Sequence, residues 1–387
     1  MSTETALNTL IDTIINHYEN DNLIAVTFLD FTKAFDSVSH DILLRKLKTN
    51  FNFSDNTIRW METYLSNRQQ KVIINNQTSI IKPIIHGVPQ GSILGPILFN
   101  LMVNDMHECT KNSSTTLIQY ADDTVLITGK KDPHTLLIET NTILKNIFKY
   151  CLKNQLFINC SKTKTLIINN KKNYNFEHKI LIDNTAVEIT SEYKYLGFII
   201  DNKLKFSSQK NFILKKLTSS NYALQRTKHL LPKNYLINIY YALSISYIIY
   251  NKSVLIGMTE NQNKSIQHQL LLSGSIIDNS KLKYVRNHMF NLQYQLEYYN
   301  YTKFYNILKK NKDTCLYKNF KKLSHSYSTR NKYTTFDPTR FKYKLSTISH
   351  KYYAIKLWNS LPKTVSGAQT FLEFQSKLKQ YLTEKHE

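Results

Sequence analysis

The pattern of apolar and polar positions near the N-terminus predicts a buried strand followed by a helix. The run Leu23–Leu29 is apolar over a length typical of a strand, and it ends at Asp30. Helical spacing of apolar positions follows around Asp41–Leu47. We therefore expect the Asp30 carboxylate at the end of a buried strand.

The next segment predicts a capped helix and then a hairpin. Ser54 is a residue type that caps helix N-termini, and apolar positions repeat at helical spacing after it. Two runs rich in isoleucine, Lys71–Ile74 and Ser79–Ile85, flank Asn75-Asn76, which favours a tight turn.

The glycine- and proline-rich segment His86–Pro96 predicts a shaped loop. Its spacing places Gln90 on the loop and starts a helix at Pro96, where the missing N–H costs nothing. This segment is the only part of the sequence that is dense in both glycine and proline.

A second hairpin is predicted by the β-rich runs Thr116–Tyr120 and Thr124–Thr128, which are separated by Ala121-Asp122-Asp123. Its tip is therefore acidic. Asp132-Pro133 then predicts the start of a long amphipathic helix that reaches Leu152.

From about Ser191 the chain becomes basic and rich in tyrosine. Another β-like run covers Tyr193–Asp201, helical segments follow, and a last helix is predicted over Thr370–Leu382. Lysines alternate with aromatic residues in the C-terminal part, so we expect an accessory nucleic-acid contact there.

Composition points to a folded protein with a polyanionic partner. The 387 residues are 42% hydrophobic, enough for two or three compact units, and their formal net charge is +23. Lysines and arginines that neutralise phosphates release counterions, so nucleic acid is the first candidate partner. An A/T-rich coding sequence, which raises Lys, Asn, Ile and Tyr together, is the alternative.

The cysteines and the apolar runs argue against a secreted, zinc-bound or membrane protein. Cys109, Cys151, Cys160 and Cys315 form no Cys-x-x-Cys pair, and we expect reduced intracellular thiols. No basic segment followed by an apolar one opens the chain, and Tyr240–Gly257 is interrupted by polar residues. We expect an intracellular protein, nuclear or cytoplasmic, that is not secreted and has no membrane partner.

The carboxylates suggest metal chemistry. One carboxylate at a strand end and two at a hairpin tip provide hard oxygen ligands on rigid elements, as two-metal phosphoryl transfer requires. Because neighbouring residues on a strand point to opposite sides, we expect Asp122 to bind metal directly and Asp123 to have a weaker or structural role. The alternative is an ordinary turn, in which aspartate is common.

Five blocks in order resemble the reverse transcriptases of non-LTR (LINE-type) retrotransposons of Jockey or CR1 character. The blocks are Phe28–Asp36, Gly87–Phe99, Tyr120-Ala121-Asp122-Asp123, Ser161–Lys164 and Tyr195-Leu196-Gly197. Lys356–Pro362 is also similar to C-terminal tails in this family, so the resemblance covers nearly the whole chain.

The resemblance implies a right-hand polymerase of α+β class and a division into three parts. Residues 1–190 would form a palm of antiparallel sheet backed by helices, with a remnant of the fingers. Residues 191–275 would carry the primer grip and a helical thumb, and residues 276–387 a basic, aromatic-rich C-terminal region. It also implies an RNA-directed DNA polymerase that uses an RNA template, a DNA primer and dNTPs.

The resemblance also assigns catalytic roles. Asp30 and Asp122 would coordinate two Mg²⁺ ions, for which Mn²⁺ is a possible substitute. The Phe31 carbonyl would be a further ligand, and Asp123 would complete the acidic site.

Three further residues receive nucleotide-binding roles, each with an alternative. Phe35 resembles a steric gate that excludes a ribose 2′-hydroxyl, the alternative being a core aromatic. Gln90 would contact the incoming nucleotide and template, or be only a polar loop residue. Lys162 would neutralise the triphosphate or protonate pyrophosphate, or be a solvated lysine.

The last block would lie near the primer, as a grip formed by Tyr195, Leu196 and Gly197.

The sequence departs from the family at its start. Ser2–Ala6 resembles a segment that lies just before the family's first catalytic strand, so we expect an N-terminally truncated chain. The upstream fingers, the apurinic-type endonuclease and a Cys/His knuckle would be missing, through a truncated gene model or decay of the element. A catalytically inactive nucleic-acid-binding remnant is therefore the alternative function. An RNA-dependent RNA polymerase, which Phe35 and Ala121 disfavour, is the third.

Overall fold

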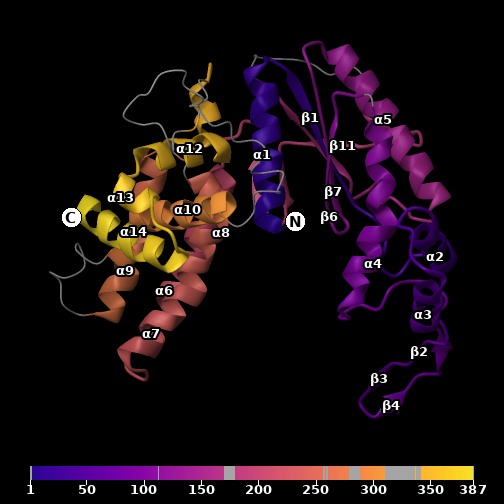
Figure 1. Cartoon of the computed structure of the whole chain (residues 1–387), viewed down its shortest axis with the longest axis horizontal. Coiled ribbons are helices and arrows are strands. Elements are labelled where there is room, and N and C mark those ends of the chain that lie inside the picture. Colours follow the sequence, from indigo (N-terminus) through magenta and orange to yellow (C-terminus); the bar gives the residue numbers. More distant parts are fainter. Residues whose placement is uncertain are drawn as a thin grey trace. The chain divides into compact units, whose positions relative to one another are not determined.

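The structure, a computed structural model, describes residues 2–111, 113–169, 179–255, 258, 260–278, 288–309, 336 and 341–386 (Figure 1). Its contacts divide the chain into two units, Met1–Leu196 and Gly197–Glu387. Strands and helices are mixed in the first unit, and helices dominate the second, so the predicted α+β class is confirmed. Much of the predicted C-terminal region, Cys315 included, lies outside the described residues.

The first unit contains the following elements in chain order: α1 (Thr3–Glu19), β1 (Leu23–Leu29), α2 (His40–Thr49), α3 (Asp55–Leu65), β2 (Gln69–Gln70), β3 (Ile73–Ile74), β4 (Gln77–Thr78), β5 (Lys82–Pro83), α4 (Leu94–Val103), the 3₁₀ segment η1 (Asn104–Thr110), β6 (Thr116–Tyr120), β7 (Asp123–Lys130), α5 (Pro133–Lys153), β8 (Lys164–Ile168), β9 (Leu181–Ile182), β10 (Thr185–Ala186), β11 (Glu188–Thr190) and β12 (Glu192–Tyr195).

A five-stranded sheet organises this unit, with strand order β11-β8-β1-β7-β6. β1 lies at its centre, antiparallel to both β7 and β8, and every residue of β1 is buried. A strand that is buried on both faces has a continuous apolar run in its sequence, which is the pattern of Leu23–Leu29.

Helices cover both faces of the sheet. Leu23, Ala25 and Leu29 of β1 belong to one core with the apolar face of α5. On the other face α1 packs so closely that a Cβ at Gly129 of β7 would meet the His17 ring at 2.2 Å. The site at the strand ends therefore rests on a sheet held from both sides.

Local sequence signals account for several element boundaries. Ser54 caps α3 by accepting a hydrogen bond from the Thr57 N–H, and Asp132 caps α5 through the Thr135 N–H, both as predicted. The predicted turn at Asn75-Asn76 is confirmed. Both asparagines have positive φ, and the partner strand begins at Gln77 rather than Ser79 because a two-residue turn pairs Ile74 with Gln77.

One further boundary and one core position differ from the prediction. Helix α4 begins at Leu94, two residues before Pro96, because the Ser92 hydroxyl accepts a hydrogen bond from the Gly95 N–H and closes the first turn early. The helical spacing of apolar residues up to Leu152 predicts that Leu152 belongs to the core, but at the end of α5 its side chain is exposed, because only one stripe of a helix can face the core.

The second unit contains the following elements in chain order: β13 (Phe198–Asp201), α6 (Ser207–Thr227), α7 (Lys233–Tyr240), the π-helical segment η2 (Tyr241–Ile245), α8 (Ser246–Leu255), α9 (Glu260–Ile277), η3 (His288–Phe290), α10 (Leu292–Lys309), η4 (Lys344–Ile348), α12 (His350–Ser360), α13 (Lys363–Ser366) and α14 (Phe371–His386).

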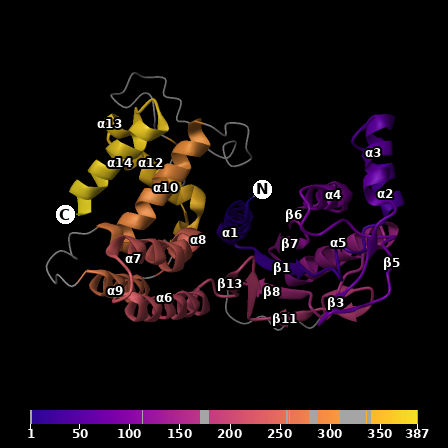
Figure 2. The same cartoon turned by 90° about the horizontal axis from the view of Figure 1, so that it is seen from below.

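Helices α6 and α9 lie side by side in this unit (Figure 2). Aromatic residues of α10, α12 and α14 form a separate core, in which Tyr305 stacks on Phe374 and Phe304 lies edge-on to Trp358. In the described ranges, no helix is long and apolar enough to cross a membrane. Cys109, Cys151 and Cys160 are free thiols.

Candidate active site

The strand register brings the predicted carboxylates to one end of the central sheet. Leu29 pairs with Thr124, so Asp30, which follows β1, and Asp123, which opens β7, leave neighbouring strands at the same end. Pairing of Tyr120 with Asp123 leaves Ala121-Asp122 as the turn between β6 and β7. Two blocks that lie far apart in the sequence therefore meet at one edge.

The turn differs in detail from the predicted acidic tip. Asp123 belongs to the strand, and only Ala121 and Asp122 form the turn. Ala121 has a φ of +52°, a left-handed conformation that costs a residue with a Cβ about 1–2 kcal/mol. Such local strain, kept at the position before the acidic pair, is a feature found at functional sites.

The electrostatics at this end of the sheet act on Asp123. Loss of water around its carboxyl, followed by the charges of Asp122 and Asp30, raises the pKa of Asp123, although the residue is exposed at the surface of the chain. Like charges that share a site oppose each other's ionisation. A bound cation would relieve this repulsion.

Tyr193 is a neighbour of the carboxylates that the sequence did not reveal. Its ring stacks on Phe28 at 4.1 Å between centroids, and Phe28 lies two residues before Asp30 on β1. Burial and then the charges of Asp30 and Asp123 raise the pKa of its phenol. Its position just ahead of the predicted grip was the only available signal.

Backbone contacts fix the position of Asp30. Its N–H donates to the Thr163 hydroxyl at 3.3 Å, and its carbonyl accepts from the Asn159 N–H at 2.8 Å. The next residue, Phe31, is bridged to Ile158. The block that contains Lys162 thus supports the strand end through the buried Thr163, which the sequence did not single out.

The Lys162 side chain itself is exposed, and its neighbour Lys164 forms an ion pair with Glu188. The backbone N–H of Lys162 turns back to Asn159. Its placement beside the Asp30 segment leaves both interpretations of this lysine open.

The glycine-rich loop docks onto the turn that follows Asp30. The Gly87 N–H donates to the Val38 carbonyl at 2.7 Å, and the Val88 N–H to the Phe35 carbonyl at 2.9 Å. Gln90 Nε2 donates to Asp36 Oδ1 at 2.8 Å, and the Gln90 side chain is partly exposed. The first two predicted blocks therefore form one structural unit.

Phe35 has features of both interpretations offered for it. Its ring is half-buried and stacks on Phe99 of α4 at 4.6 Å between centroids. One side of the ring is thus fixed by the core, while part of it remains accessible.

The predicted grip residues lie in the turn where the chain passes from the first unit to the second. Leu196 and Gly197 both have positive φ, and Tyr195 is buried with its ring 5.5 Å from that of Phe28. Leucine is unusual in a turn that needs positive φ at two residues, so the backbone is strained here as well.

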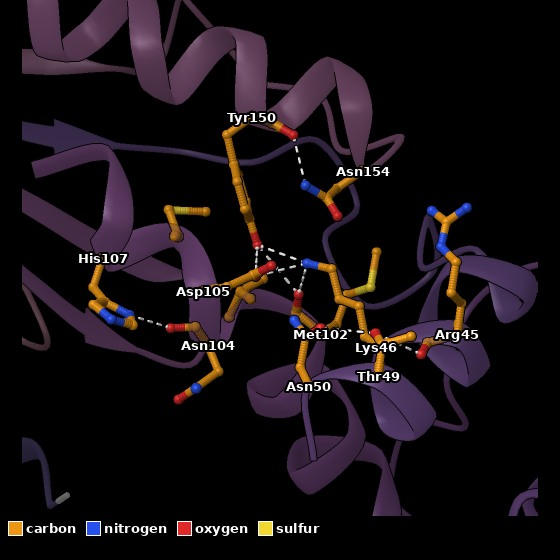
Figure 3. Close-up of polar contacts among 12 residues, drawn as sticks. Arg45, Lys46, Thr49, Asn50, Met102, Asn104, Asp105, His107, Tyr150 and Asn154 are labelled. Carbon is orange, nitrogen blue, oxygen red and sulfur yellow. Dashed lines mark hydrogen bonds and ion pairs between the residues drawn. The ribbon is translucent and has the colours of Figure 1, made fainter. Parts of the chain in front are cut away.

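A buried ion pair lies between α2, η1 and α5 in the same unit (Figure 3). Lys46 Nζ donates to the Met102 carbonyl and to Asp105 Oδ1, each at 2.7 Å, and to the Tyr150 hydroxyl at 3.0 Å. The Tyr150 hydroxyl donates to Asp105 at 2.5 Å. This cluster connects three segments that follow the first three blocks along the chain.

Burial lowers the pKa of Lys46, although Asp105 opposes the shift. Burial alone would raise the pKa of Asp105, but hydrogen bonds from Lys46 and Tyr150 hold it below its usual range. Hydrogen bonds from and to neighbouring groups satisfy both members of the pair, as buried charged groups in proteins require.

The order of the blocks agrees with a comparison with protein families. The profile of the family described as reverse transcriptase (RNA-dependent DNA polymerase) matches residues 4–200. This chain belongs to the reverse transcriptase family. The matched residues include every predicted site residue, from Asp30 to Gly197.

The relatives of this reverse transcriptase chain come from mobile elements. It is 30% identical over 209 residues to the RNA-directed DNA polymerase from mobile element jockey of Drosophila melanogaster, an alignment that covers 52% of this chain and 22% of that protein. It is 27% identical over 210 residues to the probable RNA-directed DNA polymerase from transposon BS of the same organism, covering 53% and 23%. The alignments thus span about a fifth of these relatives, and the predicted Jockey-like, non-LTR resemblance is confirmed.

Among solved structures, the reverse transcriptase chain is similar to telomerase from Candida tropicalis in complex with a TWJ fragment of telomeric RNA. The identity is 12%, the TM-score 0.42, and the coverage 97% of this chain and 52% of that chain. A Candida albicans telomerase in complex with a TWJ fragment matches at 13% identity with a TM-score of 0.37, covering 79% and 51%.

Proposed function

We propose that this chain is the polymerase core of a non-LTR retrotransposon and copies RNA into DNA by adding dNTPs to a primer 3′-hydroxyl. The observation that carries the proposal is the meeting of Asp30 with Asp122 and Asp123 at one sheet edge, where their charges interact. Family membership and the mobile-element relatives support it. Two-metal phosphoryl transfer is the chemistry that such a set of carboxylates serves.

The donor set suits Mg²⁺, with Mn²⁺ as a substitute. Among the described residues, no three histidine, cysteine, aspartate or glutamate side chains lie together so that they could hold a metal ion by themselves. Mg²⁺ in polymerases is held by one or two carboxylates together with substrate phosphates, so a group of three protein ligands is not required. Asp30, Asp122 and the Phe31 carbonyl would hold the ions, and Asp123 would add negative charge. When bound, the ions would activate the primer hydroxyl and neutralise the triphosphate.

The protein's own contribution is to position these groups. The Thr163 hydroxyl and the Asn159 N–H fix the Asp30 backbone, and the docked loop fixes Gln90 relative to the segment that follows Asp30. Correct placement of reacting groups is the main source of catalysis where no covalent intermediate forms. Gln90 would contact the incoming nucleotide and template, and Lys162 would balance charge on the triphosphate.

Phe35 is proposed as the gate against ribonucleotides. Its stack on Phe99 holds the ring in place, and a ring held rigidly can exclude a 2′-hydroxyl by shape alone. Tyr195, Leu196 and Gly197 would lie near the primer backbone, with residues 191–275 as grip and thumb. The basic region 276–387 would bind nucleic acid outside the active site.

The charge pattern supports a nucleic-acid-binding thumb. No acidic residue occurs between Asp201 and Glu260, while lysines recur throughout this segment. Phosphates are bound by such surfaces without reading the base sequence.

Primer extension on an RNA template with Mg²⁺ tests the proposal. The chain should extend the primer, and Asp30→Ala and Asp122→Ala should reduce extension by several orders of magnitude. Lys48→Ala, which removes an exposed lysine paired with Asp55, is the matched control and should extend normally. Extension that survives Asp122→Ala would refute the assignment.

Two further outcomes separate the alternatives. Tight RNA binding by the folded chain without any primer extension, in Mg²⁺ or in Mn²⁺, would favour an inactive nucleic-acid-binding remnant.

Phe35→Val should increase incorporation of ribonucleotides, and unchanged rejection of them would count against the gate.

A further inference from the structure

An aromatic ladder on the outer face of α3 has no role in the site described above. Trp60 and Tyr64 are stacked with ring centroids 6.2 Å apart, and the Arg68 guanidinium lies 5.4 Å from the Tyr64 ring centroid. Trp60 and Tyr64 are four residues apart and line one face of α3, whereas Arg68 lies beyond the end of the helix and its side chain folds back onto Tyr64. We call Trp60, Tyr64 and Arg68 the α3 ladder.

The ladder is fixed at one end and exposed at the other. Met61 and Leu65 bury the inner face of α3, and Tyr64 packs partly against the same core. Arg68 also donates to the Tyr64 carbonyl at 3.3 Å. The Trp60 side chain, by contrast, is 55% exposed, which is costly for the largest apolar side chain.

The charge around the ladder favours a polyanion. Between residues 56 and 104 the sequence has one acidic residue, Glu62, against Arg59, Arg68, Lys71 and Lys82. Flat rings that alternate with guanidinium groups on a positive surface are the groups on which unpaired bases stack. A protein partner would be favoured instead by the exposed isoleucines of the β3–β4 hairpin, which projects beyond α3 in Figure 1.

We propose that the α3 ladder is a stacking site for unpaired bases of single-stranded nucleic acid, separate from the carboxylate site. Trp60 supplies the exposed platform, Tyr64 orients it, and Arg68 contributes a second planar surface and a positive charge. The inference deepens the proposed function and rests on it, because a polymerase that copies RNA needs a place for unpaired template. Base stacking depends little on sequence, so the site would accept any base.

The test measures binding without metal ions or dNTPs, and therefore without polymerisation. The full chain is titrated with three fluorescently labelled probes: oligo(U) of about 20 nucleotides, oligo(dT) of the same length, and a duplex of that length. A length of about 20 nucleotides exceeds the site size of a typical single-strand-binding module. Trp60→Ala should weaken the binding of single strands more than that of the duplex, and the RNA and DNA arms show which strand the site prefers. Trp60→Ala should weaken single-strand binding about 5- to 100-fold, the range for loss of one stacked base.

Matched variants separate stacking from loss of apolar surface. Trp60→Phe should retain most of the affinity, and Leu152→Ala, at an equally exposed apolar residue of α5, should leave it unchanged. Arg68→Lys keeps the positive charge but removes the planar guanidinium group. It should therefore weaken binding while the salt dependence of the affinity stays the same. Circular dichroism of each variant confirms folding.

Intrinsic fluorescence gives a second readout. The chain has two tryptophans, and Trp358 is buried, so an oligonucleotide stacked on Trp60 should quench emission from the exposed one. Trp60→Phe should abolish this quenching while binding persists. Quenching that persists in Trp60→Phe would overturn the assignment.

Failure of this inference differs from failure of the polymerase proposal. Equal affinity of Trp60→Ala and the unaltered chain would refute the ladder even if primers are extended. An equal effect of Trp60→Ala on duplex and on single-strand affinity would refute it too. A change of self-association in Trp60→Ala with unchanged oligonucleotide affinity would show that the face binds protein instead. Trp60-dependent binding in a chain that extends no primer would leave the ladder intact.

Discussion

At the scale of single residues, Asp123 illustrates a conflict between stability and function. Its pKa is raised by loss of water and by Asp122 and Asp30, so the folded chain binds this proton more tightly than the unfolded chain. Stability therefore falls as the pH rises from the ordinary aspartate pKa, about 4, through the raised folded value. Residues that serve a charged site often carry such a cost.

Asp123→Asn should consequently raise the melting temperature at a pH of about 7 in the presence of EDTA. The gain should shrink below a pH of about 4, where the native carboxyl is protonated in both states. Added Mg²⁺ should stabilise the unaltered chain more than the variant, because it would relieve the same repulsion. Thermal unfolding at the two pH values, with and without Mg²⁺, measures this; equal melting temperatures at neutral pH would contradict it.

Gly87 and Gly91 form a matched pair for testing how the loop is held. Both have positive φ, +91° and +77°. A Cβ at Gly87 would meet the Asp36 Cα and carbonyl oxygen at 2.9 Å, whereas a Cβ at Gly91 meets nothing within 4 Å. The first glycine thus serves both backbone conformation and close approach, and the second serves conformation alone.

Gly87→Ala should therefore destabilise the fold by about 2–3 kcal/mol, and Gly91→Ala by about 1 kcal/mol. Chemical denaturation of both variants measures the difference. The larger loss should be accompanied by loss of primer extension, because the Gln90 loop would separate from the turn at Asp36. Equal losses in the two variants would show that the contact with Asp36 does not matter.

At the scale of elements, the buried pair of Lys46 and Asp105 can be compared with an exposed pair on neighbouring residues. Lys46→Met removes the donor to the Met102 carbonyl, to Asp105 and to Tyr150. The free energy of unfolding should therefore fall by about 2–4 kcal/mol, which is less than for a fully buried pair because Asp105 is partly exposed. Lys48→Met, which breaks an exposed pair with Asp55, should have an effect too small to resolve. Urea unfolding of both variants provides the comparison.

The pH dependence of this cluster follows from Asp105. Hydrogen bonds lower its folded pKa, so its contribution is complete above the unfolded value, about 4, and is lost as the pH falls through the folded value. The difference between Lys46→Met and the unaltered chain should therefore narrow in acid. A constant difference from neutral pH down to a pH of about 3 would show that Asp105 does not carry the effect.

Sequence patterns predicted elements whose signals are local, and missed contacts that are not. Caps at Ser54 and Asp132, the turn at Asn75-Asn76 and the strand that ends at Asp30 all depend on neighbouring residues, and the structure agrees with them. Lys46 looked like one polar position of an amphipathic helix, because its partner lies 59 residues away. Tyr193 was missed for the same reason, since its partner Phe28 lies on a distant strand.

The candidate active site also contains contacts that local sequence patterns did not predict. The resemblance to a family identified Asp30, Asp122 and Asp123, because acidic turns alone are too common to be informative. It did not reveal that Thr163, rather than a charged residue of the same block, holds the Asp30 backbone. Backbone support depends on register and burial, which no local pattern encodes.

At the scale of the whole molecule, the net charge of +23 has two explanations that salt can separate. If the lysines bind phosphates, the logarithm of affinity falls linearly with the logarithm of salt concentration, with a slope near about −0.7 for each phosphate contacted on a single strand. If they reflect only coding bias, most would lie away from the nucleic acid, and the slope would be small. We expect about six contacts, and therefore a slope of about −4.

One lysine of α6 and one lysine elsewhere that is paired with a glutamate provide the variants that separate the two explanations. Lys215 is exposed in a segment without acidic residues, so Lys215→Ala should make the slope shallower by about 0.7 and weaken binding to all sequences equally. Lys111 lies 2.7 Å from Glu108, which already balances its charge, so Lys111→Ala should leave the slope unchanged. Binding isotherms between about 50 and 200 mM salt measure both. Equal slopes in the two variants would mean that α6 does not face the nucleic acid, and that the charge of this segment follows from composition rather than from binding.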